Sequence, residues 1–573
     1  MDKLKLLKKY WGYSSFRSNQ EQIIDNLLKG KDTIGILPTA GGKSICYQLP
    51  AMIMKGPVLV ISPLIALMID QVRQLERLGI KAMYFESNSK SPPIQQQIDN
   101  CIHGNYNLVY SSPERFLNSF FINHLKQVNF SLITIDEAHC ISEWGQDFRP
   151  SYRKLGLLQT FFPKTPILAL TGSATIEVEK DIQDILKLKD AKLFKSSFER
   201  TNISYNILKK SDKYSTLIKL LAENRGSSII YCNSRKLTEN LSQFINLNGY
   251  GATFFHGGLN IEQKKKNLKV WKSGDLKHIV ATSALSMGIN KSDVRMIIHF
   301  QFPESIENFY QETGRAGRDK KDAFCYLLYQ NNDSKEIKNQ LLKKIPTRSE
   351  IEDTYKSLCN FFQIAFGEGR GSSFFLDLKS FCKRYNQSIN KTRQVIKFFQ
   401  IAGVYSLMIS NEKKIHLNVI TSIDHVISYI ENRNLAAQIL EFIMRKNPYF
   451  IDEITILSPH KLCKVFKISF DQLLDEFEIL NKRRILDFKI HETDIEIIPL
   501  TPRQDNYTIK PVIDLAKKIR LIKKKKIRLM IQFLENDFSC KRNYILSYFG
   551  EIKNENCKKC SSYCCNINTA KTK

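Results

Sequence analysis

The chain has 573 residues, 43% of them hydrophobic, and its formal net charge at pH 7 is +29. This length is sufficient for three or four domains, and the hydrophobic content is ordinary for globular protein. The most apolar stretch, residues 49–69, is interrupted by Lys55, Gly56, Pro57 and Pro63, which excludes one clean membrane-spanning helix. The excess charge therefore favours nucleic acid over an anionic membrane surface as a partner, although a Lys- and Asn-rich composition also raises it.

The thirteen cysteines are not spaced like a disulfide framework. Eight are scattered singly and five lie within the last 34 residues, a distribution that predicts a reducing cytoplasm and a local metal site. Residues 1–13 form a short basic helix without an apolar core of signal-peptide length, so secretion is not expected.

The first functional element in the chain is a predicted strand, glycine loop and helix. The loop LPTAGGKS, residues 37–44, follows the apolar run 33–37. Such a loop points backbone N–H groups at a phosphate chain, lets Lys43 reach the outer phosphates and places the Ser44 hydroxyl on Mg²⁺. Leu37 stands where the usual GxxxxGK[ST] pattern has its first glycine, so a glycine loop without a ligand is the alternative.

The sequence DEAH at residues 136–139 follows the apolar run 132–135, the pattern of a buried strand that delivers acids at its carboxyl end. Asp136 is then placed to hold Mg²⁺, and Glu137 to orient or deprotonate an attacking water. The alternative is a solvated acidic turn, which the phosphate loop upstream disfavours.

A second α/β unit begins at the apolar run 229–233. Near its end, the segment QETGRAGRD at residues 311–319 starts with Gln311 and carries Arg315 and Arg318 on one helical face. An arginine supplied across a cleft stabilises charge on a transferring phosphoryl group. Taken alone, such a pair is more often a surface salt-bridge face.

Together these segments resemble the superfamily-two helicases, and within them the RecQ DNA helicases, over about residues 8–330. The resemblance implies an α/β fold with two tandem RecA-like parallel-sheet lobes, residues 1–200 and 201–343, that bind ATP in the cleft between them. Ala40 and Ser286 each replace a glycine that is usual in the family, and the added methyl group narrows the backbone freedom of the phosphate loop. Catalytic roles are implied for Lys43, Asp136, Glu137, Gln311, Arg315 and Arg318.

The same resemblance implies how ATP and DNA are contacted. Tyr13 and Arg17 would sandwich the adenine, and Gln20 would hydrogen-bond its edge. Residues 140–150, CISEWGQDFRP, resemble the aromatic-rich loop by which the family couples single-strand binding to hydrolysis. The coupling residues would be Trp144, Phe148 and Arg149, and the phosphates would lie on Thr39, Ala40, Gly41, Gly42, Lys43 and Ser44.

Beyond residue 345 the residue pattern predicts two winged-helix-like modules, residues 344–424 and 425–504. Each has two helices followed by a β-hairpin. The alternative is that one or both modules are packing scaffolds without DNA contact. The helices are predicted at 374–385, 390–402, 461–468 and 470–483, and the hairpins at 405–420 and 485–500.

The last segment, residues 505–573, is predicted to be a basic helical hairpin. Its helical run 513–533 carries eight lysines and arginines, which fit phosphate contacts or a plain solvated helix face. CKR at 540–542 and LSYFGE at 546–551 resemble RecQ segments that lead to a zinc site. The implied Zn²⁺ ligands are Cys540, Cys557, Cys560 and either Cys564 or Cys565, and Cys564 is chosen because it needs the smaller loop extension. Idle thiols in a frayed tail are the alternative.

The leading hypothesis is an ATP-dependent DNA helicase that moves 3′ to 5′ in recombination, repair or replication-fork processing. Its cofactors would be ATP, Mg²⁺ and Zn²⁺, and its partner single-stranded and tailed or branched duplex DNA. It would act as a monomer in the cytoplasm, at the bacterial nucleoid. Two alternatives are an RNA helicase or remodeller, which the aromatic-rich segment disfavours, and a DNA-binding scaffold with a weakened ATPase, which the intact Lys43, Glu137, Arg315 and Arg318 disfavour.

Overall fold

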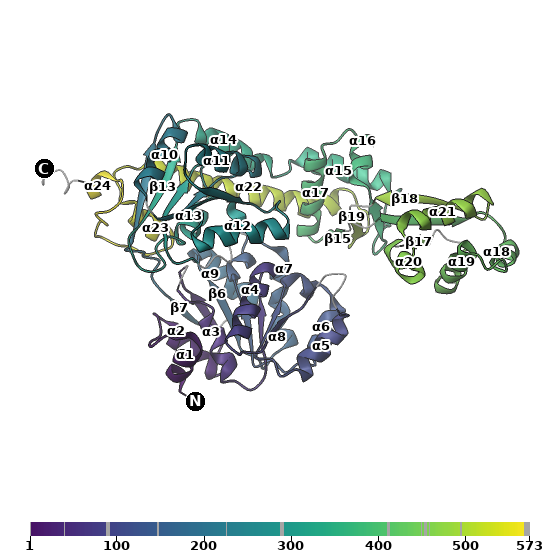
Figure 1. Ribbon diagram of the computed structural model, residues 1–573, viewed down its shortest axis with the longest axis horizontal. Helices are drawn as coiled ribbons and strands as arrows, with labels where there is room; N and C mark the ends of the chain where they lie inside the picture. The colour runs from purple at the N-terminus through teal and green to yellow at the C-terminus, as the bar shows by residue number, and fades with distance from the viewer. Residues whose placement is uncertain are drawn as a thin grey trace. The chain divides into compact units, whose positions relative to one another are not determined.

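The computed structural model of the protein divides into two compact units, residues 1–342 with 521–573, and residues 343–520 (Figure 1). None of the helices in the described ranges is long and apolar enough to cross a membrane. The structure describes residues 2–38, 41–86, 92–145, 148–188, 190–224, 226–286, 291–409, 413–447, 450–451, 455–457, 459–492 and 495–566.

The first lobe is built on a seven-stranded parallel sheet with the strand order β3-β4-β2-β5-β6-β1-β7. Most of its strands are short apolar runs buried along their whole length, as expected of a parallel sheet covered on both faces. Within β2, Val58 and Val60 pack in one core while Leu59 and Ile61 pack in another. The strands are β1 (Thr33–Ile36), β2 (Val58–Ile61), β3 (Ala82–Tyr84), β4 (Leu108–Ser111), β5 (Leu132–Ile135), β6 (Ile167–Thr171) and β7 (Lys192–Lys195).

Amphipathic helices cover this sheet. In α4, for example, Met68, Val72 and Leu75 are buried at helical spacing while the other face is polar. The α-helices are α1 (Lys3–Trp11), α2 (Gln20–Leu28), α3 (Ile45–Gln48), α4 (Ile65–Arg77), α5 (Ile94–His103), α6 (Ser119–Leu125), α7 (Pro150–Arg153), α8 (Leu158–Phe161) and α9 (Ile176–Leu186). Short 3₁₀ turns are η1 (Pro50–Met52), η2 (Pro113–Leu117), η3 (Ala138–Ile141) and η4 (Lys154–Leu157).

The second lobe has a six-stranded parallel sheet with the order β10-β11-β9-β12-β13-β8. The predicted two-lobed α/β fold is thereby confirmed. Its strands are β8 (Ile203–Lys209), β9 (Ser227–Tyr231), β10 (Ala252–Phe255), β11 (His278–Ala281), β12 (Val294–His299) and β13 (Ala323–Tyr329). Its helices are α10 (Lys213–Glu223), α11 (Arg235–Leu247), α12 (Ile261–Ser273), α13 (Ile306–Thr313), α14 (Asp333–Lys343) and the 3₁₀ turn η5 (Ser283–Ser286).

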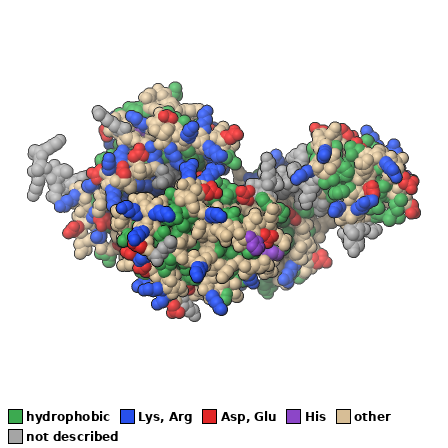
Figure 2. Space-filling model, turned by 60° about the horizontal axis from the view of Figure 1, so that its bottom comes forward, with side chains coloured by type: hydrophobic (Ala, Val, Ile, Leu, Met, Phe, Trp, Pro, Cys, Tyr) green, Lys and Arg blue, Asp and Glu red, His purple; other side chains and the backbone are tan. Residues whose placement is uncertain are grey.

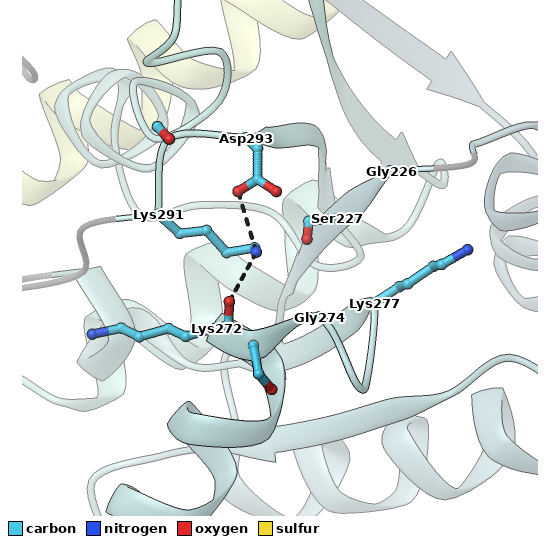
Figure 3. A pocket seen from close by; sticks show the side chains of 9 residues that line it. Gly226, Ser227, Lys272, Gly274, Lys277, Lys291 and Asp293 are labelled. Carbon is cyan, nitrogen blue, oxygen red and sulfur yellow. Dashed lines mark hydrogen bonds and ion pairs between the residues drawn. The ribbon is translucent and has the colours of Figure 1, made fainter.

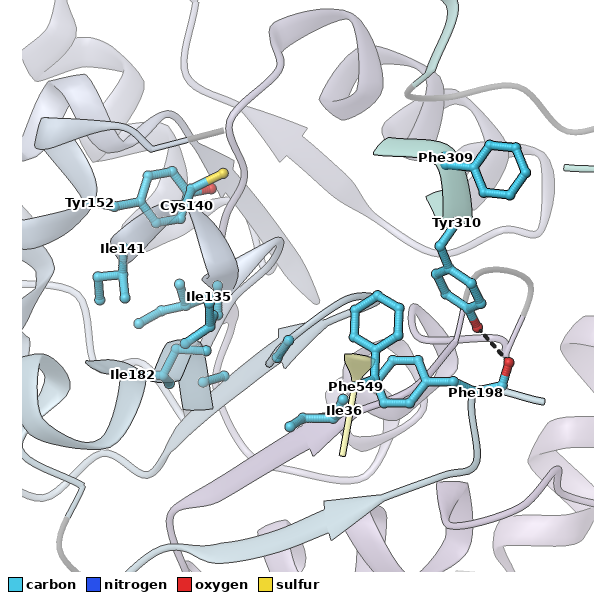
Figure 4. Packing of buried hydrophobic residues seen from close by; sticks show 14 of the residues in the cluster. Ile36, Ile135, Cys140, Ile141, Tyr152, Ile182, Phe198, Phe309, Tyr310 and Phe549 are labelled. Atoms are coloured by element: carbon cyan, nitrogen blue, oxygen red, sulfur yellow. Dashed lines mark hydrogen bonds between the residues drawn. The ribbon is translucent and has the colours of Figure 1, made fainter. Parts of the chain in front are cut away.

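The C-terminal segment packs against residues 197–202, the stretch of chain that crosses from the first lobe to the second. The ring of Phe549 stacks on Phe198 with centroids 4.5 Å apart, and the Tyr310 hydroxyl donates to the Phe198 carbonyl at 3.0 Å (Figure 4). The Glu551 carboxylate accepts from the Phe198 N–H, and Arg542 pairs with Glu199 at 2.8 Å. This segment comprises the second half of α22 (Asn506–Glu535), α23 (Lys541–Tyr548) and α24 (Tyr563–Asn566).

The other unit, residues 343–520, contains two small antiparallel sheets, β14-β19-β15 and β17-β16-β18. Its strands are β14 (Phe374–Leu376), β15 (Tyr405–Ile409), β16 (Lys413–Val419), β17 (Thr455–Leu457), β18 (Leu486–Glu492) and β19 (Ile495–Pro499). Its helices are α15 (Arg348–Phe361), α16 (Leu378–Arg384), α17 (Ile389–Ile401), α18 (Ile423–Ile430), α19 (Leu435–Lys446), α20 (Pro459–Phe466), α21 (Phe470–Lys482) and the first part of α22.

The two predicted hairpins, 405–420 and 485–500, are wrong in their pairing although the strands lie where expected. β15 pairs with β19, and β16 pairs with β18, so each predicted hairpin is divided between the two sheets. Alternating apolar residues predict a strand and its buried face but not the strand with which it pairs. Here each strand pairs with one that is distant in the sequence. Residues 413–492 consequently form an inserted module with its own core around Leu417, Leu440 and Phe477.

Candidate nucleotide and zinc sites

The phosphate loop lies between β1 and α3, at the carboxyl end of the sheet. The Nζ of Lys43 lies 3.4 Å from Oε1 of Glu137. Room for the ammonium depends on Gly172, where a Cβ atom would lie only 2.7 Å from Nζ. Gly42 has a positive φ of 74°, which suits glycine. Thr39 and Ala40 lie outside the described residues.

The residues expected to contact adenine gather beside this loop. The Arg17 guanidinium carbon lies 5.8 Å from the centroid of the Tyr13 ring. The side-chain amide of Gln20 donates to the Gly42 carbonyl at 2.9 Å and its oxygen accepts from the Arg17 N–H at 2.7 Å. Gln20 is buried and uses both ends of its amide within the protein, so reading a base edge requires these bonds to be exchanged.

The acidic pair follows β5 and is held by several hydrogen bonds. Glu137 adopts a left-handed backbone at φ 49°, and its N–H donates to the Asp136 side chain at 2.9 Å. The Tyr152 hydroxyl donates to the Asp136 carbonyl at 2.9 Å, and His139 lies between Glu137 and the Thr171 hydroxyl. Such backbone strain in a non-glycine residue is found preferentially at functional sites.

The two carboxylates titrate in opposite directions. Burial and the neighbouring charge of Glu137 raise the pKa of Asp136 to about 6. Burial alone would raise the pKa of Glu137 too, but the charges of Lys43 and Arg315, together with the neighbouring His139 ring, outweigh burial and lower it. Glu137 is therefore ionised at neutral pH in a site where Asp136 is close to titrating.

The second lobe contributes its side chains through α13 and the turn that follows. The Gln311 amide donates to the Ser173 hydroxyl of the first lobe at 2.8 Å. Arg315 is only 5% exposed, and among the residues that the structure describes its Nε and Nη1 have no hydrogen-bond partner. Burial and the charges of Arg315 and Arg200 lower the pKa of Arg318 to about 10. Unsatisfied guanidinium N–H groups beside a phosphate loop fit an anion that the arginine is built to receive.

The aromatic-rich segment leads away from the acidic pair. Arg149 donates to the Pro63 carbonyl at 2.7 Å and its N–H to the Cys140 carbonyl at 2.9 Å, which fixes the end of the segment to the first lobe. Trp144 and Phe148 are both partly exposed. Tyr152 contacts the acidic pair and was not identified from the sequence, because it belongs to no recognisable motif. Lys525 contacts Trp144, whereas in the sequence it is only one cation of the basic run.

Four cysteines gather in the C-terminal segment. The Sγ atoms of Cys540, Cys557, Cys560 and Cys565 all lie within 4.8 Å of one another. Individual separations are 3.9 Å for Cys540 to Cys560, 3.7 Å for Cys557 to Cys565 and 3.3 Å for Cys560 to Cys565. A tetrahedral Zn²⁺ with bonds of about 2.3 Å needs sulfurs about 3.8 Å apart, so the set fits zinc.

The choice of Cys564 as the fourth ligand is corrected by this cluster. Both candidates lie on α24, where neighbouring side chains point in different directions. Cys565 is the one that turns inward and is buried, while Cys564 is partly exposed. Loop length alone favoured Cys564, but the direction of the short helix places the Cys565 sulfur in the cluster.

A further pocket of the second lobe lies at the amino ends of its strands (Figure 3). Lys291 pairs with Asp293 at 3.2 Å and donates to the Lys272 carbonyl. The side chains of Lys272 and Lys277 point away from Lys291. Ligands of parallel α/β sheets bind at the carboxyl ends of the strands, so this pocket is on the wrong edge for the nucleotide.

Two parallel-sheet lobes with a phosphate loop and acidic pair on one and paired arginines on the other define a helicase-type nucleotide-binding fold. In agreement, the sequence matches the family described as DEAD/DEAH box helicase over residues 17–185 and the helicase conserved C-terminal domain over 212–320. Residues 503–565 match the RecQ zinc-binding family.

Three relatives illustrate the similarity. ATP-dependent DNA helicase RecQ of Pasteurella multocida is 42% identical over 342 residues, which are 60% of this chain and 54% of the relative. Probable ATP-dependent DNA helicase RecS of Bacillus subtilis is 40% identical over 357 residues, 61% of this chain and 72% of the relative. Putative ATP-dependent RNA helicase R290 of Acanthamoeba polyphaga mimivirus is 39% identical over 339 residues, 57% of this chain and 60% of the relative.

The chain belongs to the RecQ family of helicases. It spans little more than half the length of the bacterial RecQ relatives that it matches.

The opposite pKa shifts of the acidic pair predict opposite effects on stability. Without nucleotide or Mg²⁺, Asp136→Asn should raise the Tm at pH 7.5, because it removes a charge that burial disfavours. Because the pKa of Asp136 is raised from 3.8 to about 6, the cost of burying its charge develops as the pH rises between these two values. The increase in Tm caused by Asp136→Asn should therefore be smaller at pH 5 than at pH 7.5. Glu137→Gln should lower the Tm at pH 7.5. The pKa of Glu137 is lowered in the fold, so its ionised form stabilises the fold at pH values above the ordinary glutamate pKa of 4.5. Thermal melts between pH 5 and 8 measure both, and shifts of the same sign at pH 7.5 would contradict the assignment.

The cysteine cluster predicts a sharp difference between neighbours. Cys565→Ser should lose zinc and lower the Tm, because a structural site with three thiolates binds the metal more weakly and metal binding is coupled to folding. Cys564→Ser, one residue away on α24, should keep one zinc per chain. Elemental analysis of both purified variants makes the measurement, and loss of zinc from the Cys564 variant alone would restore the original choice.

Proposed function

We propose that the protein is an ATP-dependent DNA helicase that translocates 3′ to 5′. The observation that carries this proposal is the meeting of Lys43 and Glu137 from one lobe with the buried, unsatisfied N–H groups of Arg315 from the other. A site divided between two lobes is completed only when they close on the nucleotide, so each hydrolysis cycle can open and close them.

The contacts of the site residues suggest a role for each of them in ATP hydrolysis. Lys43 pairs with Glu137 now, and an incoming phosphate chain would compete for its ammonium and free Glu137 to accept a proton from the attacking water. Arg315 would donate its unsatisfied N–H groups to the transferring phosphoryl group. Asp136 and Ser44 would hold Mg²⁺, which neutralises phosphate charge when it is bound. The bond from Gln311 to Ser173 ties α13, the helix that leads to Arg315, to the first lobe.

The proposed partner is single-stranded DNA joined to a duplex. The aromatic-rich segment leads directly from the acidic pair, and base stacking on such side chains suits a strand of any sequence. On the face drawn in Figure 2, lysines and arginines are scattered among acidic side chains, so charge alone marks no strand path there. Polarity and a role in recombination, repair or fork processing rest on the family resemblance, as does action at the nucleoid by a monomer.

RNA unwinding is the alternative with a specific observation behind it, since one relative carries the name of an RNA helicase. The match to the RecQ zinc-binding family over residues 503–565 supports DNA instead. A scaffold with a decayed ATPase is disfavoured because the lysine, both carboxylates and both arginines are all retained.

The test is ATP-driven strand displacement on matched DNA and RNA duplexes that bear either a 3′ or a 5′ tail. We expect displacement of the 3′-tailed DNA only. Lys43→Ala should abolish hydrolysis and displacement while DNA binding changes little, because the ammonium contacts the nucleotide rather than the strand.

Preference for the RNA duplexes would replace the proposal with its alternative. Near-normal hydrolysis by the Lys43 variant would mean that the nucleotide site is misplaced. DNA binding should also weaken steeply as salt rises, because counterions are released on binding.

A further inference from the structure

The basic helix α22 does not present all of its cations to solvent. Lys526 lies with its Nζ 2.9 Å from Oε1 of Glu307 and donates to the Gly145 carbonyl at 3.0 Å. The side chains of Lys526 and Glu307 are 12% and 4% exposed. One buried ammonium therefore joins three separate elements: the C-terminal helix, the aromatic-rich segment of the first lobe and the start of α13 in the second.

The neighbouring lysine adds to this contact from the exposed side. The Nζ of Lys525 lies 5.0 Å from the centroid of the Trp144 ring and 3.6 Å from Glu177. Trp144, Glu307 and both lysines line one small cavity together with Tyr548. An ammonium over a ring is attracted by its face, so Trp144 is partly covered on the side of α22.

The carboxylate of Glu307 depends on this arrangement. Burial would raise its pKa, but the charge of Lys526 and the nearby polar groups of Ser305 and Tyr548 outweigh burial and lower it. Removing Lys526 would leave the buried Glu307 carboxylate without its cation. Removing a lysine that faces solvent would have no such cost.

The position of Lys526 gives the contact a consequence for the ATP site. Gly145 lies in the segment that starts at the acidic pair, and Glu307 begins the helix that carries Gln311 and leads to Arg315. A strand that stacks on the aromatic-rich segment would displace Gly145, and Lys526 would pass that displacement to α13.

We propose that Lys526 is a positioning residue that couples occupancy of the aromatic-rich segment by single-stranded DNA to the placement of α13, the helix that leads to Arg315. This inference rests on the proposed function, because it concerns how DNA stimulates the same ATP site. It also reassigns one cation of the basic helix from DNA contact or a solvated face to a bridge within the protein.

The test compares Lys526→Met, Lys526→Arg and Lys524→Met. Lys526→Met removes the charge at similar size, and its ATPase rate at saturating oligo-dT should fall about tenfold while the rate without DNA stays within about twofold. The oligo-dT concentration for half-stimulation should change little. Lys526→Arg keeps a cation that can donate to both partners and should restore most of the stimulation. Lys524→Met removes an exposed lysine of the same helix and should behave like the unmodified protein.

Amide hydrogen exchange of the DNA-free proteins tests the bridge without reference to activity. Peptides that contain Trp144 and Gly145 should exchange faster in Lys526→Met than in Lys524→Met. Unchanged exchange, full stimulation of Lys526→Met, or an equal fall of both rates that Lys526→Arg does not rescue would each overturn the inference. If oligo-dT fails to stimulate the unmodified protein, the proposed function fails instead, and the exchange result still decides whether the bridge exists.

Discussion

The site depends on a buried guanidinium in the second lobe that lies close to the partly buried carboxylates of the first. Arg315 has N–H groups without acceptors, and it is close enough to Glu137 to lower the pKa of that carboxyl. Neither group would be stable there alone, because an isolated buried charge is costly. The negative charge that develops on a transferring phosphoryl group would complete this arrangement, so the two lobes are electrostatically prepared for a reaction in the site that they share.

Much of this site could be predicted from the sequence, because its chemistry is local. The phosphate loop and the acidic pair place their functional groups within a few residues of a strand end, and the arginines follow directly after helix α13. What the sequence could not provide are contacts between distant segments. The bonds of Gln20 to the loop and of Gln311 to Ser173 depend on how elements pack, and neither is visible in a motif.

The errors have the same physical origin. The strands at 405–420 and 485–500 were recognised from alternation, but strand alternation leaves the partner open, and β15 and β16 join different sheets. Loop length favoured Cys564 over Cys565, and only the direction of α24 shows that Cys565 lies in the cluster. The basic run in α22 likewise gave no sign that Lys526 is buried against Glu307.

The C-terminal segment docks on the crossing between the two lobes. Three of its residues make the docking contacts: Arg542 pairs with Glu199, the Glu551 carboxylate accepts from the Phe198 N–H, and Phe549 stacks on the Phe198 ring. The cysteine cluster closes the end of this segment near the edge strand β8, where the Ser561 N–H donates to the Tyr205 carbonyl at 3.2 Å. A zinc ion there would hold the docking surface in shape without approaching the nucleotide.

The most direct test of the central claim measures ATP affinity and turnover separately in Arg315→Ala. If the guanidinium acts on the transferring phosphoryl group, the Kd for ATP should stay within about threefold while kcat falls by about 10³ or more. Near-normal kcat, or a rise in Kd that accounts for the whole loss, would contradict the account, because Arg315 would then bind the ground state or nothing at all.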